Sequence, residues 1–138
     1  MKKDSNNNSN IKWLEEYFDL YKESLFDKKT FDSLFLLSEE WKKTSSDGGK
    51  IIFLGNGGSA AMASHCSVDL SKNAGVRSIN FNEADLITCL ANDYGYENWM
   101  SASLEIYADS KDHVVLISSS GGSPNIINAA QKAKEMGL

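Results

Sequence analysis

Apolar side chains recur at spacings of three and four residues in the first third of the chain, and this period predicts two amphipathic helices. The first repeat covers residues 11–25 and the second covers residues 30–41. A glycine-rich stretch at residues 45–49 then marks a helix stop, so the helical pair is expected within residues 11–46. Residues 1–10 are polar and rich in asparagine, and we expect them to form a disordered tail.

After this pair the pattern changes to short apolar strands that alternate with helices. Strands are expected at residues 50–54, 77–81 and 113–117, and helices at residues 57–71, 85–92, 97–108 and 124–136. Such alternation is typical of an α/β fold with a doubly wound, flavodoxin-like parallel sheet. We therefore expect one domain over residues 11–138, with its α/β part at residues 50–138. Three strands are few for an open sheet, so the chain is expected to be C-terminally incomplete.

The two N-terminal helices carry more aromatic surface than a lone helical pair can hide. The aromatic side chains are Trp13, Tyr17, Phe18, Tyr21, Phe26, Phe31, Phe35 and Trp41. One interpretation is an oligomerisation element, with a helical bundle between subunits. The other is that the pair packs on the sheet of its own chain. The sequence leaves both open.

Composition narrows the range of partners. The net charge of −5 over 138 residues disfavours nucleic acid, which needs a basic face. No apolar run approaches the roughly 20 residues that cross a bilayer, and the N-terminal residues do not resemble a signal peptide. We therefore expect a cytoplasmic protein with no nucleic-acid or membrane partner. Cys66 and Cys89 form no Cys-x-x-Cys pair and are expected to be buried, reduced thiols.

A glycine-rich turn connects the strand to the helix within residues 51–60, Ile-Ile-Phe-Leu-Gly-Asn-Gly-Gly-Ser-Ala. Glycines let the backbone approach a ligand closely, and the free N–H groups of the next helix favour an anion. Gly55, Gly57 and Ala60 also fit the dinucleotide fingerprint Gly-x-Gly-x-x-Ala. That fingerprint requires an acidic residue at the end of the second strand, whereas Glu83 comes late. A dinucleotide site is therefore the weaker alternative.

A serine-rich loop follows the last expected strand, with the sequence Ser118-Ser119-Ser120-Gly121-Gly122-Ser123-Pro124. Its hydroxyls and backbone N–H groups can surround a phosphate without a cation. A serine followed by a proline is a good helix start, with the hydroxyl at the N-cap. Ligands of such sheets bind beyond the carboxyl ends of the strands, where both loops emerge. We interpret the segment as a phosphate cradle rather than a flexible linker.

These motifs resemble the sugar isomerase (SIS) domain family, and within it most closely the sedoheptulose 7-phosphate isomerases. The residues that carry the resemblance are Gly55–Ala60, His65, Asp69, Ala91–Tyr96 and Ile117–Asn125. They agree with the family in order and spacing, and the similarity extends from about Trp13 to Leu138. The resemblance implies a homotetramer whose active sites lie around the N-terminal helices.

The resemblance also implies roles for individual residues. Ser118, Ser120 and Ser123 would hold the sugar phosphate, with Ser119 contributing its backbone. The glycine turn would face the sugar through Asn56, Gly57, Gly58 and Ser59, and Asp93 would reach the sugar hydroxyls. Interconverting a ketose and an aldose phosphate moves a proton through an enediol, which needs a base and an acid.

His65 and Asp69 are the expected catalytic pair. They lie four residues apart on one helix and therefore share a face. Some family members bind zinc at these two positions, so zinc is a candidate cofactor here. On spacing alone, His65 could equally be a packed histidine beside the loop. Two ligands are also fewer than the three protein ligands of a catalytic zinc.

The chain departs from the family pattern near this pair. The family usually has a glutamate at the position of Asp69, and an arginine where this chain has Asn73 next to Lys72. The resemblance implies that a glutamine and a histidine of the family site would come after Leu138. Two functions therefore stay open: an isomerase that supplies heptose for surface polysaccharide, and a non-catalytic SIS module. Such a module would bind a sugar phosphate or a protein partner, like the replication-initiator-binding relative.

Overall fold

The computed structural model describes residues 3–138, with side chains from Asn8 onward. Its chain divides into two units, Met1–Glu39 and Glu40–Leu138. The first unit contains helix α1 (Lys3–Leu25) and the first part of α2 (Lys28–Ser46). The structure thus continues α1 back to Lys3, where the sequence predicted a tail over residues 1–10. Met1 and Lys2 lie outside the described residues.

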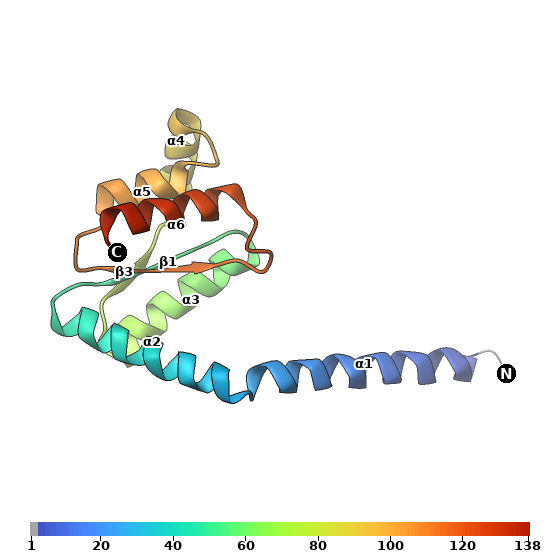
Figure 1. The fold of residues 1–138 in the computed structure, drawn as a ribbon. Helices are drawn as coiled ribbons and strands as arrows, with labels where there is room; N and C mark the ends of the chain where they lie inside the picture. Colours follow the sequence, from blue (N-terminus) through green and yellow to red (C-terminus); the bar gives the residue numbers. More distant parts are fainter. Residues whose placement is uncertain (1–2) are drawn as a thin grey trace. The chain divides into compact units, whose positions relative to one another are not determined.

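The second unit is built on a three-stranded parallel sheet. The strands are β1 (Ile51–Gly55), β2 (Ser78–Asn80) and β3 (His113–Ile117), in the order β2-β1-β3. Four helices connect or follow them: α3 (Gly58–Asn73), α4 (Ala84–Tyr94), α5 (Trp99–Tyr107) and α6 (Pro124–Met136). In Figure 1, α3 lies on one side of β1 and β3, and α5 and α6 lie on the other. The predicted doubly wound α/β fold is confirmed.

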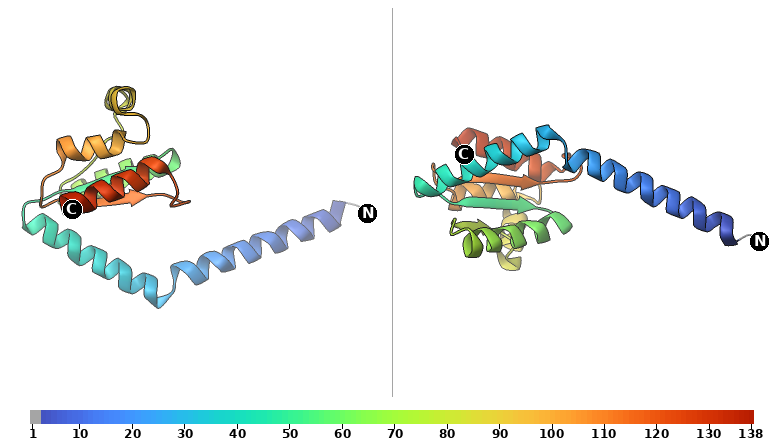
Figure 2. Two further views of the ribbon diagram at one scale, coloured as in Figure 1. Left: turned by 45° about the horizontal axis from the view of Figure 1, so that its top comes forward. Right: turned by 90° about the horizontal axis from the view of Figure 1, so that it is seen from below.

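Alternation along β1 explains the two layers. Ile52 and Leu54 face a core with residues of α4, α5 and α6, whereas Ile51 and Phe53 face α3. Successive side chains of a strand point to opposite faces, so a strand covered on both sides is apolar throughout. All five residues of β1 are buried. The views in Figure 2 show the same helices on the two sides of the sheet.

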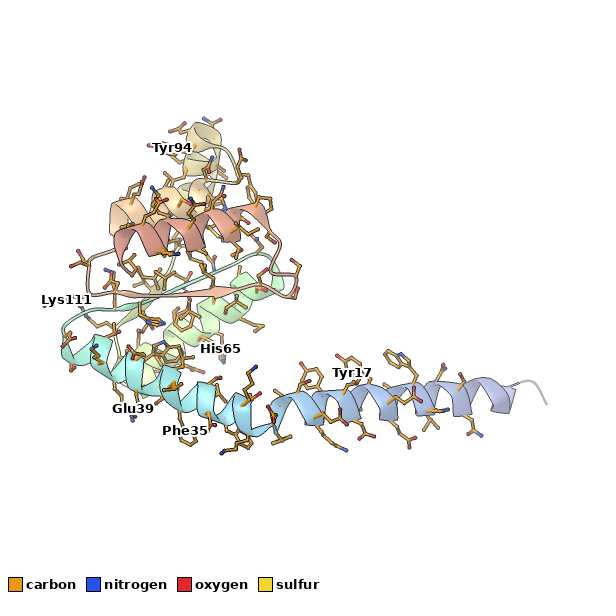
Figure 3. All side chains as sticks on the ribbon, in the orientation of Figure 1. Tyr17, Phe35, Glu39, His65, Tyr94 and Lys111 are labelled. Atoms are coloured by element: carbon orange, nitrogen blue, oxygen red, sulfur yellow. The ribbon has the colours of Figure 1, made fainter. Side chains whose placement is uncertain are left out.

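The aromatic residues of the predicted helical pair have different environments. Trp41, in the second unit, packs edge-on against Phe53 of β1 with ring centroids 5.8 Å apart. In the first unit, Trp13, Tyr17 and Phe18 are exposed within the chain, and Figure 3 shows the Tyr17 ring standing out from α1. Packing on the sheet therefore holds for Trp41, while an oligomerisation role for the first unit stays a prediction.

A buried carboxylate lies at the end of the sheet where β1 and β3 begin. The Asp112 side chain is 1% exposed and accepts hydrogen bonds from Lys50 Nζ at 2.5 Å and from the backbone N–H of Lys50 at 2.9 Å. It also accepts the backbone N–H of Asp109 at 2.8 Å. This cluster joins the segments that enter β1 and β3.

Two predictions about the surface can be compared with the structure. The expected burial of Cys66 and Cys89 is wrong, because both thiols are free and exposed on α3 and α4. Each helix packs on the core with only one side, and the sequence does not show on which side a lone cysteine lies. Among the described residues, no helix is both long and apolar enough to span a membrane.

Candidate functional site

Two loops leave the same edge of the sheet. Gly55, the last residue of β1, is paired with Ile117, the last residue of β3. Because the two strands are parallel, the glycine turn and the serine loop emerge side by side at their carboxyl ends. This is the edge at which ligands bind in doubly wound sheets.

The glycine turn is tight for identifiable reasons. Gly57, the N-cap of α3, has φ +54 and ψ −120, a conformation that residues with a side chain rarely adopt. A Cβ atom on Gly55 would lie 2.6 Å from the carbonyl carbon of Ser59. The turn therefore brings the N-terminus of the 16-residue helix α3 against the end of β1. The positive end of the helix dipole there favours a negatively charged ligand.

The serine loop is held in shape by its own hydroxyl groups. Ser118 Oγ accepts the backbone N–H of Gly121 at 3.1 Å, and Ser120 Oγ accepts that of Gly122 at 3.2 Å. Ser123 occupies the N-cap of α6, yet its hydroxyl makes no capping hydrogen bond. The accepting hydroxyls keep their own O–H groups for a ligand. The loop thus presents hydroxyl groups at the N-terminus of α6.

A side-chain bridge that the sequence analysis missed connects the two loops. Asn56 Nδ2 donates to Asn125 Oδ1 at 2.9 Å, and Asn125 Nδ2 donates back to Asn56 Oδ1 at 2.8 Å. The Tyr96 hydroxyl donates to the same Asn56 oxygen at 3.3 Å. The available signal was the position of Asn125 directly after Ser123-Pro124, and that of Tyr96 in the Asn-Asp-Tyr-Gly-Tyr segment.

His65 and Asp69 lie on one face of α3, as their spacing predicts. His65 Nε2 is 3.2 Å from Asp69 Oδ2, and the side chains are 78% and 51% exposed. Asn73, four residues further along α3, donates from Nδ2 to Asp69 Oδ1 at 3.2 Å. The carboxylate is thus held between a histidine and an amide. In Figure 3 the His65 side chain points away from the sheet.

The same pair is the candidate zinc site. Within the part of the chain that the structure describes, no three His, Cys, Asp or Glu side chains are grouped to hold a metal ion. His65 and Asp69 thus provide two ligands, and a catalytic zinc uses three protein ligands with an open position. These residues do not by themselves fit a zinc centre.

Asp93 lies at the C-terminal end of α4. Its carboxylate accepts a hydrogen bond from Asn92 Nδ2 at 2.9 Å and contacts Cys89 Sγ at 4.0 Å. Both partners are on the same helix. The structure therefore joins the 93–96 segment to the glycine turn through Tyr96 rather than through Asp93.

Comparison with known proteins identifies the family. The SIS domain family matches residues 16–138, which is most of the chain. The chain belongs to the SIS domain family. This SIS domain is 33% identical over 135 residues to the phosphoheptose isomerase of Helicobacter pylori strain P12, covering 91% of this chain and 69% of that protein. It is 40% identical over 111 residues to phosphoheptose isomerase 1 of Campylobacter jejuni, covering 75% of this chain and 56% of that protein.

Solved structures agree on the fold. A phosphoheptose isomerase from Neisseria gonorrhoeae superposes with a TM-score of 0.72 at 27% identity, covering 91% of this chain and 71% of that one. One from Francisella tularensis gives a TM-score of 0.79 at 19% identity, with 96% and 71% covered, and supports the fold alone. The predicted resemblance is confirmed. The SIS domain spans only part of each of these enzymes, from 56% to 71% of their lengths.

Proposed function

We propose that this SIS domain binds and isomerises sedoheptulose 7-phosphate, converting it to an aldoheptose 7-phosphate through an enediol. The observation that carries the proposal is the pair of loops at one sheet edge, where the serine loop at the α6 N-terminus lies beside the turn that starts α3. Similarity to enzymes named phosphoheptose isomerase supports this substrate class. The same similarity favours a sugar phosphate over a dinucleotide. In the proposed role, the protein acts in the cytoplasm and supplies heptose for surface polysaccharide.

In the proposed complex each loop has its own task. Ser118, Ser120 and Ser123 bind the phosphate with their hydroxyls, and Ser119 contributes its backbone. Asn56, Gly57, Gly58 and Ser59 face the sugar. Asp93 binds a sugar hydroxyl, which would require the 93–96 segment to close over the substrate.

In the proposed reaction a proton moves between carbons 1 and 2. Asp69 takes the proton from one carbon and returns it to the other, and His65 exchanges protons with the substrate oxygens. Their 3.2 Å contact keeps both groups within reach of one substrate end. Zinc at this pair would need a further ligand that the described residues do not provide, and the proposed proton transfers use the two side chains alone.

The serine loop gives the direct test of substrate binding. Replacing Ser123 with alanine removes a hydroxyl that no cap contact engages, so we expect KM for sedoheptulose 7-phosphate to rise about tenfold or more, the usual cost of a hydrogen bond to a charged group. Initial rates of aldose formation measure this. The control is Ser110→Ala, which changes an exposed serine shortly before β3, at the other end of this strand from the serine loop. Equal KM values for the two variants would contradict the phosphate assignment.

A non-catalytic SIS module is the second candidate. The pairing of Asp69 with Asn73, in place of the usual glutamate and arginine, favours it. Under this function no turnover occurs at any zinc concentration, yet sugar phosphates still raise the melting temperature. Turnover by the wild-type chain excludes it.

A homotetramer formed through the N-terminal helices is also proposed. Within the first unit, Leu14, Phe18 and Tyr21 line an apolar groove of about 710 Å³ on α1. Leu14→Asp combined with Phe18→Asp places charge in this groove, so we expect light scattering to show dissociation into smaller species. The control Ser9→Asp combined with Asn10→Asp adds the same two charges at exposed polar positions of α1 and should leave the assembly intact. An unchanged mass for the double variant would place the interface elsewhere.

A further inference from the structure

The bridge between the two loops uses nearly all the hydrogen-bonding capacity of one side chain. The Asn56 Oδ1 atom has two acceptor positions, and both are taken, by Asn125 Nδ2 and by the Tyr96 hydroxyl. The Asn56 Nδ2 group donates one of its two hydrogens to Asn125. A single N–H therefore remains for any ligand.

Asn125 is the fixed member of the bridge. It is 2% exposed at the second residue of α6, and its Oδ1 atom also accepts the backbone N–H of Ile126 at 3.1 Å. A buried amide with these partners has little rotational freedom, because each alternative orientation leaves a polar group unpaired. Asn125 thus anchors Asn56 to the start of α6 across 69 residues of sequence.

We infer that Asn125 is a positioning residue, and that with Asn56 and Tyr96 it forms a clasp fixing the distance between the serine loop and the N-terminus of α3. The Asn56 side chain then faces the sugar only through its remaining N–H. The other sugar contacts at the glycine turn come from Gly57, Gly58 and Ser59. The inference rests on the proposed function for the identity of the ligand.

The chemistry of the ligand explains why this distance matters. In sedoheptulose 7-phosphate the phosphate is on carbon 7, whereas the reacting carbons 1 and 2 are at the other end of the chain. The serine loop at α6 holds one end and Asp69 on α3 serves the other. A misplacement of about 1 Å between two such groups can cost about 100-fold in rate. A ligand that occupies the serine loop alone does not depend on this distance.

The test compares a long and a short ligand. In Asn125→Ala we expect kcat/KM for sedoheptulose 7-phosphate to fall about 10- to 100-fold, while the dissociation constant of inorganic phosphate changes less than about threefold. Tyr96→Phe, which removes one hydrogen bond, should show a smaller loss. Asn128→Ala is the matched control, because this α6 asparagine bonds the Glu97 carbonyl and Asn98 instead of Asn56. Asn56→Ala combined with Asn125→Ala should be no worse than the more severe single variant.

The outcomes separate this inference from the proposed function. If wild type shows no turnover, the proposed reaction fails. Calorimetry then compares the binding of the two ligands. We expect Asn125→Ala to bind sedoheptulose 7-phosphate about tenfold more weakly than wild type, with its affinity for inorganic phosphate little changed. Equal weakening of both ligands, additive losses in the double variant, or the same loss in Asn128→Ala would overturn the clasp. Binding of neither ligand to wild type would overturn the inference and the proposed function together.

Discussion

Asp69→Asn is expected to lower kcat for sedoheptulose 7-phosphate about 10²- to 10⁴-fold, the usual contribution of a general acid or base. Asparagine keeps the shape of the side chain and an oxygen that accepts the Asn73 hydrogen bond, but it cannot take a proton from carbon. Binding should therefore survive, with the dissociation constant of the substrate within a few-fold of wild type. Steady-state kinetics and calorimetry on the same protein separate the two effects.

Two further variants control this experiment. Asp85→Asn removes an exposed carboxylate in the first turn of α4 and should leave kcat unchanged. Asp69→Glu keeps a carboxylate, so it should retain far more activity than Asp69→Asn. More than about a tenth of wild-type turnover in Asp69→Asn would exclude Asp69 as the base, since loss of a general base typically costs at least 100-fold.

Asp112→Ala is expected to lower the free energy of unfolding by about 3 kcal/mol or more, the usual cost of breaking a buried ion pair from one side. The change leaves Lys50 Nζ without its buried partner, and it removes the acceptor of the backbone N–H groups of Lys50 and Asp109. Urea denaturation followed by circular dichroism measures the loss. Asp109→Ala is the control: the Asp109 carboxylate also contacts Lys50 but is 83% exposed, so less than about 1 kcal/mol should be lost. Similar losses of unfolding free energy in both variants would contradict the expectation that the buried carboxylate contributes more than the exposed one.

The pH dependence of stability provides a second check on this cluster. Burial lowers the pKa of Lys50, but the hydrogen bonds and charges of Asp112 and Asp109 outweigh it and raise the pKa above the ordinary 10.5. A raised pKa in the folded state means that the ion pair contributes fully below the unfolded value and is lost as the pH rises through the folded one. Wild type should therefore lose stability above about pH 10.5, and Asp112→Ala should lose less over the same range.

Local spacing was enough to predict much of the architecture. The boundaries of β3 and α6 were predicted residue for residue, because an apolar strand, a serine loop and a Ser-Pro helix start are signals contained in neighbouring residues. The continuation of α1 over residues 3–10 was missed, because asparagine and serine are weak helix formers and composition alone favours a tail.

The same distinction between local signals and long-range contacts applies to the candidate site. The sequence by itself determined that His65 and Asp69 meet, since residues four apart on a helix are neighbours whatever surrounds them. It also determined that a glycine turn and a serine loop follow two strands. Only the tertiary structure decided that Asn56 bonds Asn125 and that Lys50 bonds Asp112, 69 and 62 residues away. Those partners depend on β3 lying next to β1, and strand order is set by the packing of the whole sheet rather than by any local pattern.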